Sequence, residues 1–229
     1  MRKDSPMTNF MSRRELICAA AWFLMHLLVL PQVLGGFMLS GKLDETQATY
    51  VQYAAGALFM VILCFSWFRE GFHRYMDHPF RNLFYIIGSY YAIMMFNSLI
   101  SIVLWQFMPI GNLNNEAVAG MAVDRPGMTF AMTVLLAPLV EEPLFRGVLF
   151  GGLRRKSRAA AYAVSIVFFS LYHVVNYLSY GAIYALYGII YIPSAFMLCL
   201  CYEQSDSIWS SVFLHMLVNG VAISSVLSA

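Results

Sequence analysis

The chain has 229 residues, of which 60% are hydrophobic and only 11% are charged, and its formal net charge is +2. A soluble domain usually carries about 25% charged residues, so this composition excludes an ordinary soluble protein. Several runs reach the roughly 20 apolar residues that a helix needs to cross a bilayer, which indicates a membrane protein.

Hydropathy predicts an all-α fold, a polytopic bundle of about seven transmembrane helices in a single domain, 1–229. The basic N-terminus precedes the first apolar run, and no clear small-residue cleavage site follows, so we interpret that run as a retained span rather than a signal peptide. An interfacial helix within 109–127 is an alternative to a plain connection there. The spans are expected at 16–36, 48–68, 82–107, 128–153, 159–178, 182–202 and 207–228.

The positive charges are distributed unevenly between the two sides of the predicted bundle. If the N-terminus is cytoplasmic, nearly all lysines and arginines fall in cytoplasmic segments. Only Lys42 and Arg125 lie on the opposite side, and Arg146 lies within a span. By the positive-inside rule, this asymmetry predicts a cytoplasmic N-terminus and a multi-pass protein of the cell membrane.

Three charged side chains lie within the fourth predicted span, Glu141, Glu142 and Arg146. An ionised side chain at the bilayer centre costs about 2.5–3.5 kcal/mol, so these groups are expected to face protein or a water-filled cavity. Glu142 and Arg146 are four residues apart and can pair, either as a structural ion pair or as part of a site. Glu141 points in another direction and needs a partner from another helix.

Two prolines flank the carboxylates in the same span. Pro143 cannot donate a hydrogen bond to the carbonyl of Leu139, and Pro138 cannot donate one to the carbonyl of Val134. A kinked or opened helix is therefore expected beside the carboxylates. Free carbonyl groups at membrane depth need protein or water partners, which predicts a hydrated cavity.

Polar residues in two other spans could line the same cavity. The fifth span carries His173, and the seventh carries His215 and Asn219, which are four apart and share a helix face. These residue types are used for water activation and for stabilising an oxyanion. His26, in the first span, is interpreted instead as a packed and hydrogen-bonded residue.

Three short motifs resemble those of a known protein family. Residues 141–146 read EEPLFR, residues 169–173 read FSLYH and residues 215–219 read HMLVN. They match, in order, the EExxxR, FxxxH and HxxxN elements of the CAAX-protease and bacteriocin-processing (CPBP, or Abi) intramembrane proteases. The resemblance covers about residues 125–225, which would form the catalytic core.

The resemblance implies an intramembrane peptidase with defined residue roles. Glu141 would activate the attacking water with help from His173, while His215 and Asn219 would stabilise the oxyanion. The two remaining motif residues would shape the site. The implied catalytic residues are thus Glu141, Glu142, Arg146, His173, His215 and Asn219.

The family has been described both as metal-dependent and as glutamate-dependent without a metal. A zinc ion could be held by Glu141, His173 and His215, since three protein ligands and a water suit catalytic zinc. The other glutamate would then act as the base. The expected cofactor is therefore none or zinc, and we favour the metal-free alternative.

The resemblance also suggests the partners. The expected substrate is a membrane-associated peptide or protein, such as a quorum-sensing or bacteriocin-type precursor or a CAAX-like C-terminus. Residues 1–124 carry no matching motif and are expected to select it. The lipid bilayer is the other partner, no nucleic acid is expected, and the oligomeric state is left open. The alternatives are a non-catalytic immunity or binding protein and a proton-coupled transporter.

Overall fold

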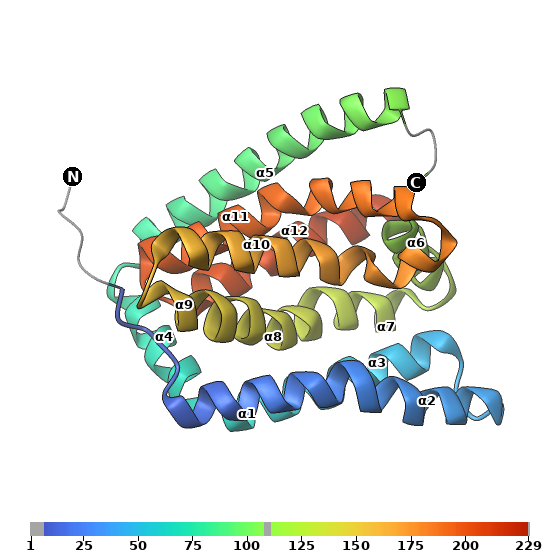
Figure 1. Ribbon diagram of the computed structural model, residues 1–229, viewed down its shortest axis with the longest axis horizontal. Coiled ribbons are helices and arrows are strands. Elements are labelled where there is room, and N and C mark those ends of the chain that lie inside the picture. Colours follow the sequence, from blue (N-terminus) through green and yellow to red (C-terminus); the bar gives the residue numbers. More distant parts are fainter. Residues whose placement is uncertain (1–6, 108–110, 229) are drawn as a thin grey trace.

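The computed structural model describes residues 7–107 and 111–228, which form a bundle of long helices (Figure 1). No strand occurs among these residues, so the predicted all-α fold is confirmed. Helices satisfy their own backbone hydrogen bonds, which is the condition for exposing a segment to lipid.

The helical elements fall into three consecutive groups. The N-terminal group consists of α1 (Arg13–Leu24), the π-helical turn η1 (Met25–Val29), α2 (Leu30–Leu39), α3 (Glu45–Leu63), α4 (Phe65–Asp77) and α5 (Pro79–Phe107). The middle group consists of α6 (Leu113–Asp124), α7 (Pro126–Phe130), the π-helical η2 (Ala131–Leu136), α8 (Ala137–Glu142), the π-helical η3 (Pro143–Gly151) and α9 (Gly152–Arg154). The C-terminal group consists of α10 (Arg158–Val174), the 3-10 helices η4 (Val175–Tyr180) and η5 (Ala182–Tyr187), α11 (Gly188–Ser205) and α12 (Ile208–Leu227).

The number of spans agrees with the prediction of about seven. Within the described residues, six helical stretches are long and apolar enough to cross a membrane, and one bent pair of helices raises the number to as many as seven. The six stretches are Arg13–Leu39, Pro79–Phe107, Pro126–Arg154, Arg158–Tyr180, Ala182–Ser205 and Ile208–Leu227.

The second predicted span, 48–68, is not one straight helix, and this detail of the prediction is wrong. The axes of α3 and α4 differ by 80°. The break is at Cys64, whose ψ of 22° lies outside the helical range. On α4, the side chains of Trp67 and Phe68 are buried while charged residues are exposed. Such an amphipathic helix suits the membrane interface better than its lipid core.

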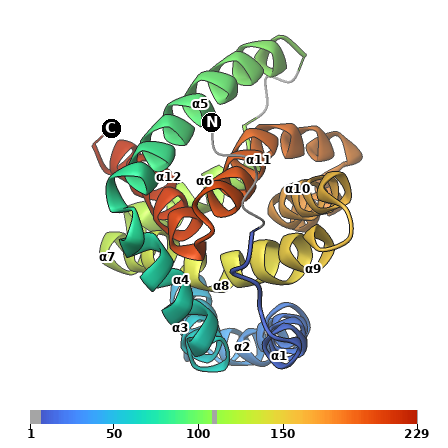
Figure 2. The same ribbon diagram turned by 90° about the vertical axis from the view of Figure 1, so that its left-hand side faces the viewer.

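The fourth span, Pro126–Arg154, lies at the centre of the bundle. Protein buries 61% of its most apolar window, compared with 17–33% for the other single spans. Figure 2 shows α8 between the α1–α3 pair and the helices α10 and α12. The expected distortion near Pro138 and Pro143 takes the form of the π-helical turns η2 and η3 within one continuous stretch. Such turns are frequent at functional sites.

A helix, α6, is present within 109–127, where an interfacial helix is the alternative to a plain connection, and residues 108–110 lie outside the described part of the chain. It connects α5 to the central span at the end of the bundle that also holds the C-terminus (Figure 1).

Ion pairs connect helices at both ends of the bundle. At one end, Arg74 of α4 lies 2.5 Å from Asp206 in the turn between α11 and α12. At the other end, Arg125 pairs with Asp44, also at 2.5 Å. This separation agrees with the predicted topology, in which the segment carrying Arg74 is cytoplasmic and the segment carrying Arg125 is not.

Candidate active site

The buried charges of the central span meet polar side chains from neighbouring helices. Glu141 and Glu142 end α8, and Arg146 follows one turn later in η3. His173 comes from α10 and His215 from α12, both of which pack on the central span. Residues that are far apart in sequence are thus brought into one buried cluster.

Glu142 is the most extensively paired member of the cluster. Its Oε2 atom lies 3.1 Å from Nε of Arg146, an ionic contact without hydrogen-bond geometry, and accepts a hydrogen bond from the hydroxyl of Ser211. Its Oε1 atom lies 2.8 Å from Nδ1 of His215. The carboxylate and the guanidinium are both fully buried. Because it is surrounded by donors and a positive charge, Glu142 acts as an ionised acceptor.

Arg146 is held by aromatic rings as well as by its carboxylate partner. Its guanidinium lies 4.6 Å from the ring centre of Phe169 and 5.8 Å from that of Phe145. One terminal nitrogen donates to the carbonyl of Ala195 at 3.4 Å. These contacts fix the positive charge beside the two glutamates without exposing it to lipid.

Glu141 has one engaged and one free oxygen. Its Oε1 atom accepts a hydrogen bond from the hydroxyl of Tyr53 at 3.3 Å. Its Oε2 atom has no hydrogen-bond partner within the described part of the chain, although the side chain is only 3% exposed. The Nε2 atoms of His173 and His215 each lie 3.9 Å from this free oxygen. The three groups therefore face one another beyond direct hydrogen-bond reach.

The hydrogen bonds of the two Nδ1 atoms determine how His173 and His215 face Glu141. Nδ1 of His173 lies 2.8 Å from the carbonyl of Phe169, which can only accept, so Nδ1 donates and carries the proton. Nδ1 of His215 donates to the ionised Glu142 in the same way. In both rings, Nε2 is the nitrogen left for chemistry, and a histidine oriented by a carboxylate is a common feature of active sites.

The proposed zinc ligands do not fit a metal ion in this arrangement. Two donors bound to tetrahedral zinc are about 3.3–3.6 Å apart, given bond lengths of about 2.0–2.2 Å. The carboxylate of Glu141 is 3.9 Å from each imidazole. Among the described residues, no three His, Cys, Asp or Glu side chains are placed to hold a metal. Glu141, His173 and His215 therefore do not fit a zinc ion in this geometry.

Asn219 is tied to the central span rather than to the glutamates. Its amide donates to the carbonyl of Thr133 in η2 at 2.8 Å. In a π-helical register the donor to this carbonyl would be residue 138, which is a proline without an N–H. We expected Pro138 to free the carbonyl of Val134, but the π-helical turn moves the effect by one residue. The amide of Asn219 carries a second hydrogen, which this bond does not use.

The sequence pattern missed three polar contributors, Tyr53, Tyr172 and Ser211. Ser211 is four residues before His215 and shares its helix face, so spacing could have identified it. The two tyrosines had no comparable signal. The interpretation of His26 is partly wrong, because the side chain is fully buried but neither ring nitrogen has a hydrogen-bond partner among the described residues.

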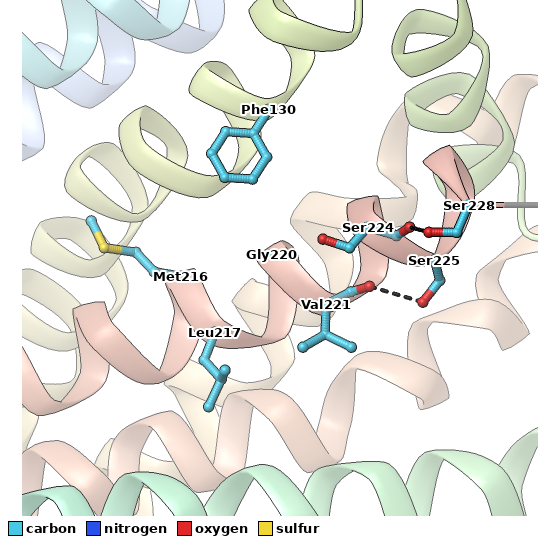
Figure 3. A pocket seen from close by; sticks show the side chains of 8 residues that line it. All are labelled: Phe130, Met216, Leu217, Gly220, Val221, Ser224, Ser225 and Ser228. Carbon is cyan, nitrogen blue, oxygen red and sulfur yellow. Dashed lines mark hydrogen bonds between the residues drawn. The ribbon is translucent and has the colours of Figure 1, made fainter.

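A shallow groove of about 600 Å³ runs beside the C-terminal half of α12 (Figure 3). Phe130 of α7 and residues of α12, including Gly220 and Val221, line it. The hydroxyls of Ser225 and Ser228 donate to carbonyls of their own helix, so they do not make the groove strongly polar. Its surface suits an apolar chain.

The comparison with protein families agrees with this geometry. Residues 125–221 match the model described as type II CAAX prenyl endopeptidase Rce1-like, and the match includes every residue predicted for the site. It covers less than half of the chain. None of the curated proteins and none of the solved structures that were compared with the chain matches it. Residues 125–221 are therefore similar to the Rce1-like CAAX proteases, in agreement with the resemblance of the three motifs to the CPBP group.

Proposed function

We propose that the protein hydrolyses a peptide bond of a membrane-associated peptide or protein by means of a water molecule that Glu141 activates. The family match supports protease chemistry. The observation that carries the mechanism is the free, buried Oε2 of Glu141, which two imidazole nitrogens face at 3.9 Å each. Separations of this size suit groups that share a water molecule.

In the first step, Glu141 accepts a proton from this water through Oε2. The neutral His173 accepts the other water hydrogen at Nε2 and so orients the oxygen lone pair toward the substrate carbonyl. The water oxygen then bonds to the carbonyl carbon, and the carbonyl oxygen takes up the negative charge.

His215 and Asn219 stabilise the negative oxygen in this proposal. His215 donates from Nε2 when both of its ring nitrogens carry protons, and its Nδ1 atom is held by the Glu142 carboxylate. With His215 protonated, the two negative charges of the glutamates balance the two positive charges of Arg146 and His215. Asn219 contributes the amide hydrogen that Thr133 does not use.

In the second step, Glu141 returns its proton to the nitrogen of the leaving amine. The carbon–nitrogen bond breaks and the carbonyl forms again, which yields a carboxylic acid and an amine. Glu142 and Arg146 take no proton in this sequence. Their contact keeps the site neutral and holds His215 in place.

The groove beside α12 supports a substrate with an apolar segment within the membrane. We propose that it accepts the apolar part of a peptide precursor or of a CAAX-like C-terminus. Specificity for such a chain would come from apolar contact along Phe130 and Val221 rather than from hydrogen bonds.

Mass spectrometry of candidate peptides tests the proposal. Purified wild type and Glu141→Ala are incubated with each peptide, with and without a chelator. We expect two product fragments from the wild type under both conditions and none from the variant. Fragments produced equally by the variant would reject the mechanism, and loss of cleavage with the chelator alone would reject its metal-free form.

A further inference from the structure

Two tyrosine hydroxyls from different halves of the chain lie beside Glu141. The hydroxyl of Tyr53, on α3, is 3.3 Å from Oε1 of Glu141 and 3.0 Å from the hydroxyl of Tyr172, on α10. The two tyrosines and the carboxylate therefore form one hydrogen-bonded chain. It ends on the oxygen that does not face the histidines.

The direction of this chain follows from counting protons. An ionised carboxylate only accepts, so the single hydroxyl hydrogen of Tyr53 is directed to Glu141. The oxygen of Tyr53 can then accept the hydrogen of Tyr172. Each donor polarises the next one, which strengthens the bond that reaches the carboxylate.

Ring packing fixes the position of both hydroxyls. The ring centre of Tyr172 lies 5.6 Å from that of Phe145 and 5.9 Å from that of Phe23. The ring of Tyr53 meets the imidazole of His26 edge-on at 5.3 Å. Each hydroxyl therefore stays in place through contacts that do not involve the carboxylate itself.

The close approach of α3 to α8 brings Tyr53 to this position. A Cβ atom on Gly56 would lie 2.9 Å from Val140 and 2.9 Å from His26, so only glycine allows this spacing. Tyr53 is three residues before Gly56 on the same helix, and Val140 directly precedes Glu141. The packing of these two helices thus determines the contact between tyrosine and carboxylate.

We propose that Tyr53 is a positioning residue that holds Oε1 of Glu141, so that Oε2 faces His173 and His215, and that Tyr172 supports it as the second donor. The proposal rests on the proposed function of Glu141. It assigns part of the reaction geometry to α3, which lies outside the matched segment 125–221. The N-terminal spans would then do more than select the substrate.

The first test compares the kinetics of hydroxyl-deletion variants on a peptide that the wild type cleaves. Tyr53→Phe is expected to lower kcat about tenfold and to leave KM unchanged, as for the loss of one hydrogen bond to a charged group. Tyr172→Phe is expected to have a smaller effect in the same direction. Tyr50→Phe, on the same helix but without a hydrogen bond to the site, is the matched control and should behave as the wild type.

The second test does not depend on activity. The infrared difference between wild type and Glu141→Gln identifies the carboxylate stretching band of Glu141. That band should shift in Tyr53→Phe, because one of its oxygens loses a donor, and should stay in place in Tyr50→Phe. A purely structural role for Tyr53 would lower the thermal midpoint without moving this band.

The outcomes separate the two proposals. If Glu141→Gln abolishes cleavage while Tyr53→Phe keeps the wild-type kcat and band position, the role of Tyr53 is rejected and the proposed function stands. If Glu141→Gln still cleaves at the wild-type rate, the proposed function fails and the positioning role fails with it.

Discussion

Glu142 and His215 are 73 residues apart in the chain, yet Oε1 of the first lies 2.8 Å from Nδ1 of the second. The contact links the central span to α12, and both side chains are buried. It also connects two networks, because Glu142 pairs with Arg146 while the far nitrogen of His215 faces Glu141. The buried ion pair and the reacting groups therefore form a single unit.

Removing one partner of the buried ion pair should destabilise the fold. Arg146→Met leaves Glu142 without its positive neighbour, so the free energy of unfolding is expected to fall by about 3–5 kcal/mol. Thermal unfolding in detergent measures this change. The partly exposed pair between Glu70 and Arg74 is the control, and Glu70→Gln should cost less than about 1 kcal/mol. Equal losses of unfolding free energy in both variants would contradict the larger contribution of the buried pair to stability.

His173 should matter for turnover rather than for folding. Among the described residues its side chain is hydrogen-bonded to the carbonyl of Phe169 in its own helix, so its replacement breaks no hydrogen bond between helices and loses only the stacking of its ring on Tyr191 of α11. His173→Gln is expected to lower kcat about 100-fold or more, with little change in the unfolding midpoint. The exposed His73 provides a control, since His73→Gln should have no effect on either quantity. A fully active His173→Gln protein would remove this residue from the mechanism.

The motif spacing predicted much of this site because the charges themselves required partners. Glu141, Glu142 and Arg146 are too costly to expose to lipid, and the helix period places the last two on one face. The histidine of α12 was expected at the oxyanion, and the structure adds its contact with Glu142, which depends on how α12 packs against α8.

Other features depend on tertiary packing and had no local signal. Tyr53 reaches the site only because Gly56 allows α3 to approach α8 closely. Hydropathy predicts one span for the apolar run that the bend at Cys64 interrupts, because the bend depends on how the two helices pack. The carbonyl that Pro138 leaves free depends on the π-helical register, which hydropathy does not report.

Asn219 is expected to have two separable effects. Asn219→Ala removes a proposed oxyanion donor and should lower kcat about 100-fold. It also leaves the carbonyl of Thr133 without its partner, which should cost about 1–3 kcal/mol of stability. Pro138→Ala restores a backbone N–H near that carbonyl, so the double variant should regain stability but not activity. Recovery of both would show that Asn219 acts only through packing.

The groove beside α12 should affect substrate binding more than chemistry. Val221→Trp fills the groove and is expected to raise KM several-fold with kcat nearly unchanged. Val167→Trp, at another exposed apolar position on α10, is the matched control and should leave KM as it is. If both variants raise KM equally, the effect comes from the bilayer-facing surface in general.

The most direct measurement is the rate at which purified Glu141→Gln cleaves a peptide that the wild type processes. The substitution keeps the size and shape of the side chain, so it removes the base while preserving the packing against Tyr53. Product formation should fall at least 100-fold, with an unchanged unfolding midpoint. Cleavage at the wild-type rate would contradict the account, as would full biological activity in the absence of any cleavage, the result expected of a binding or immunity protein.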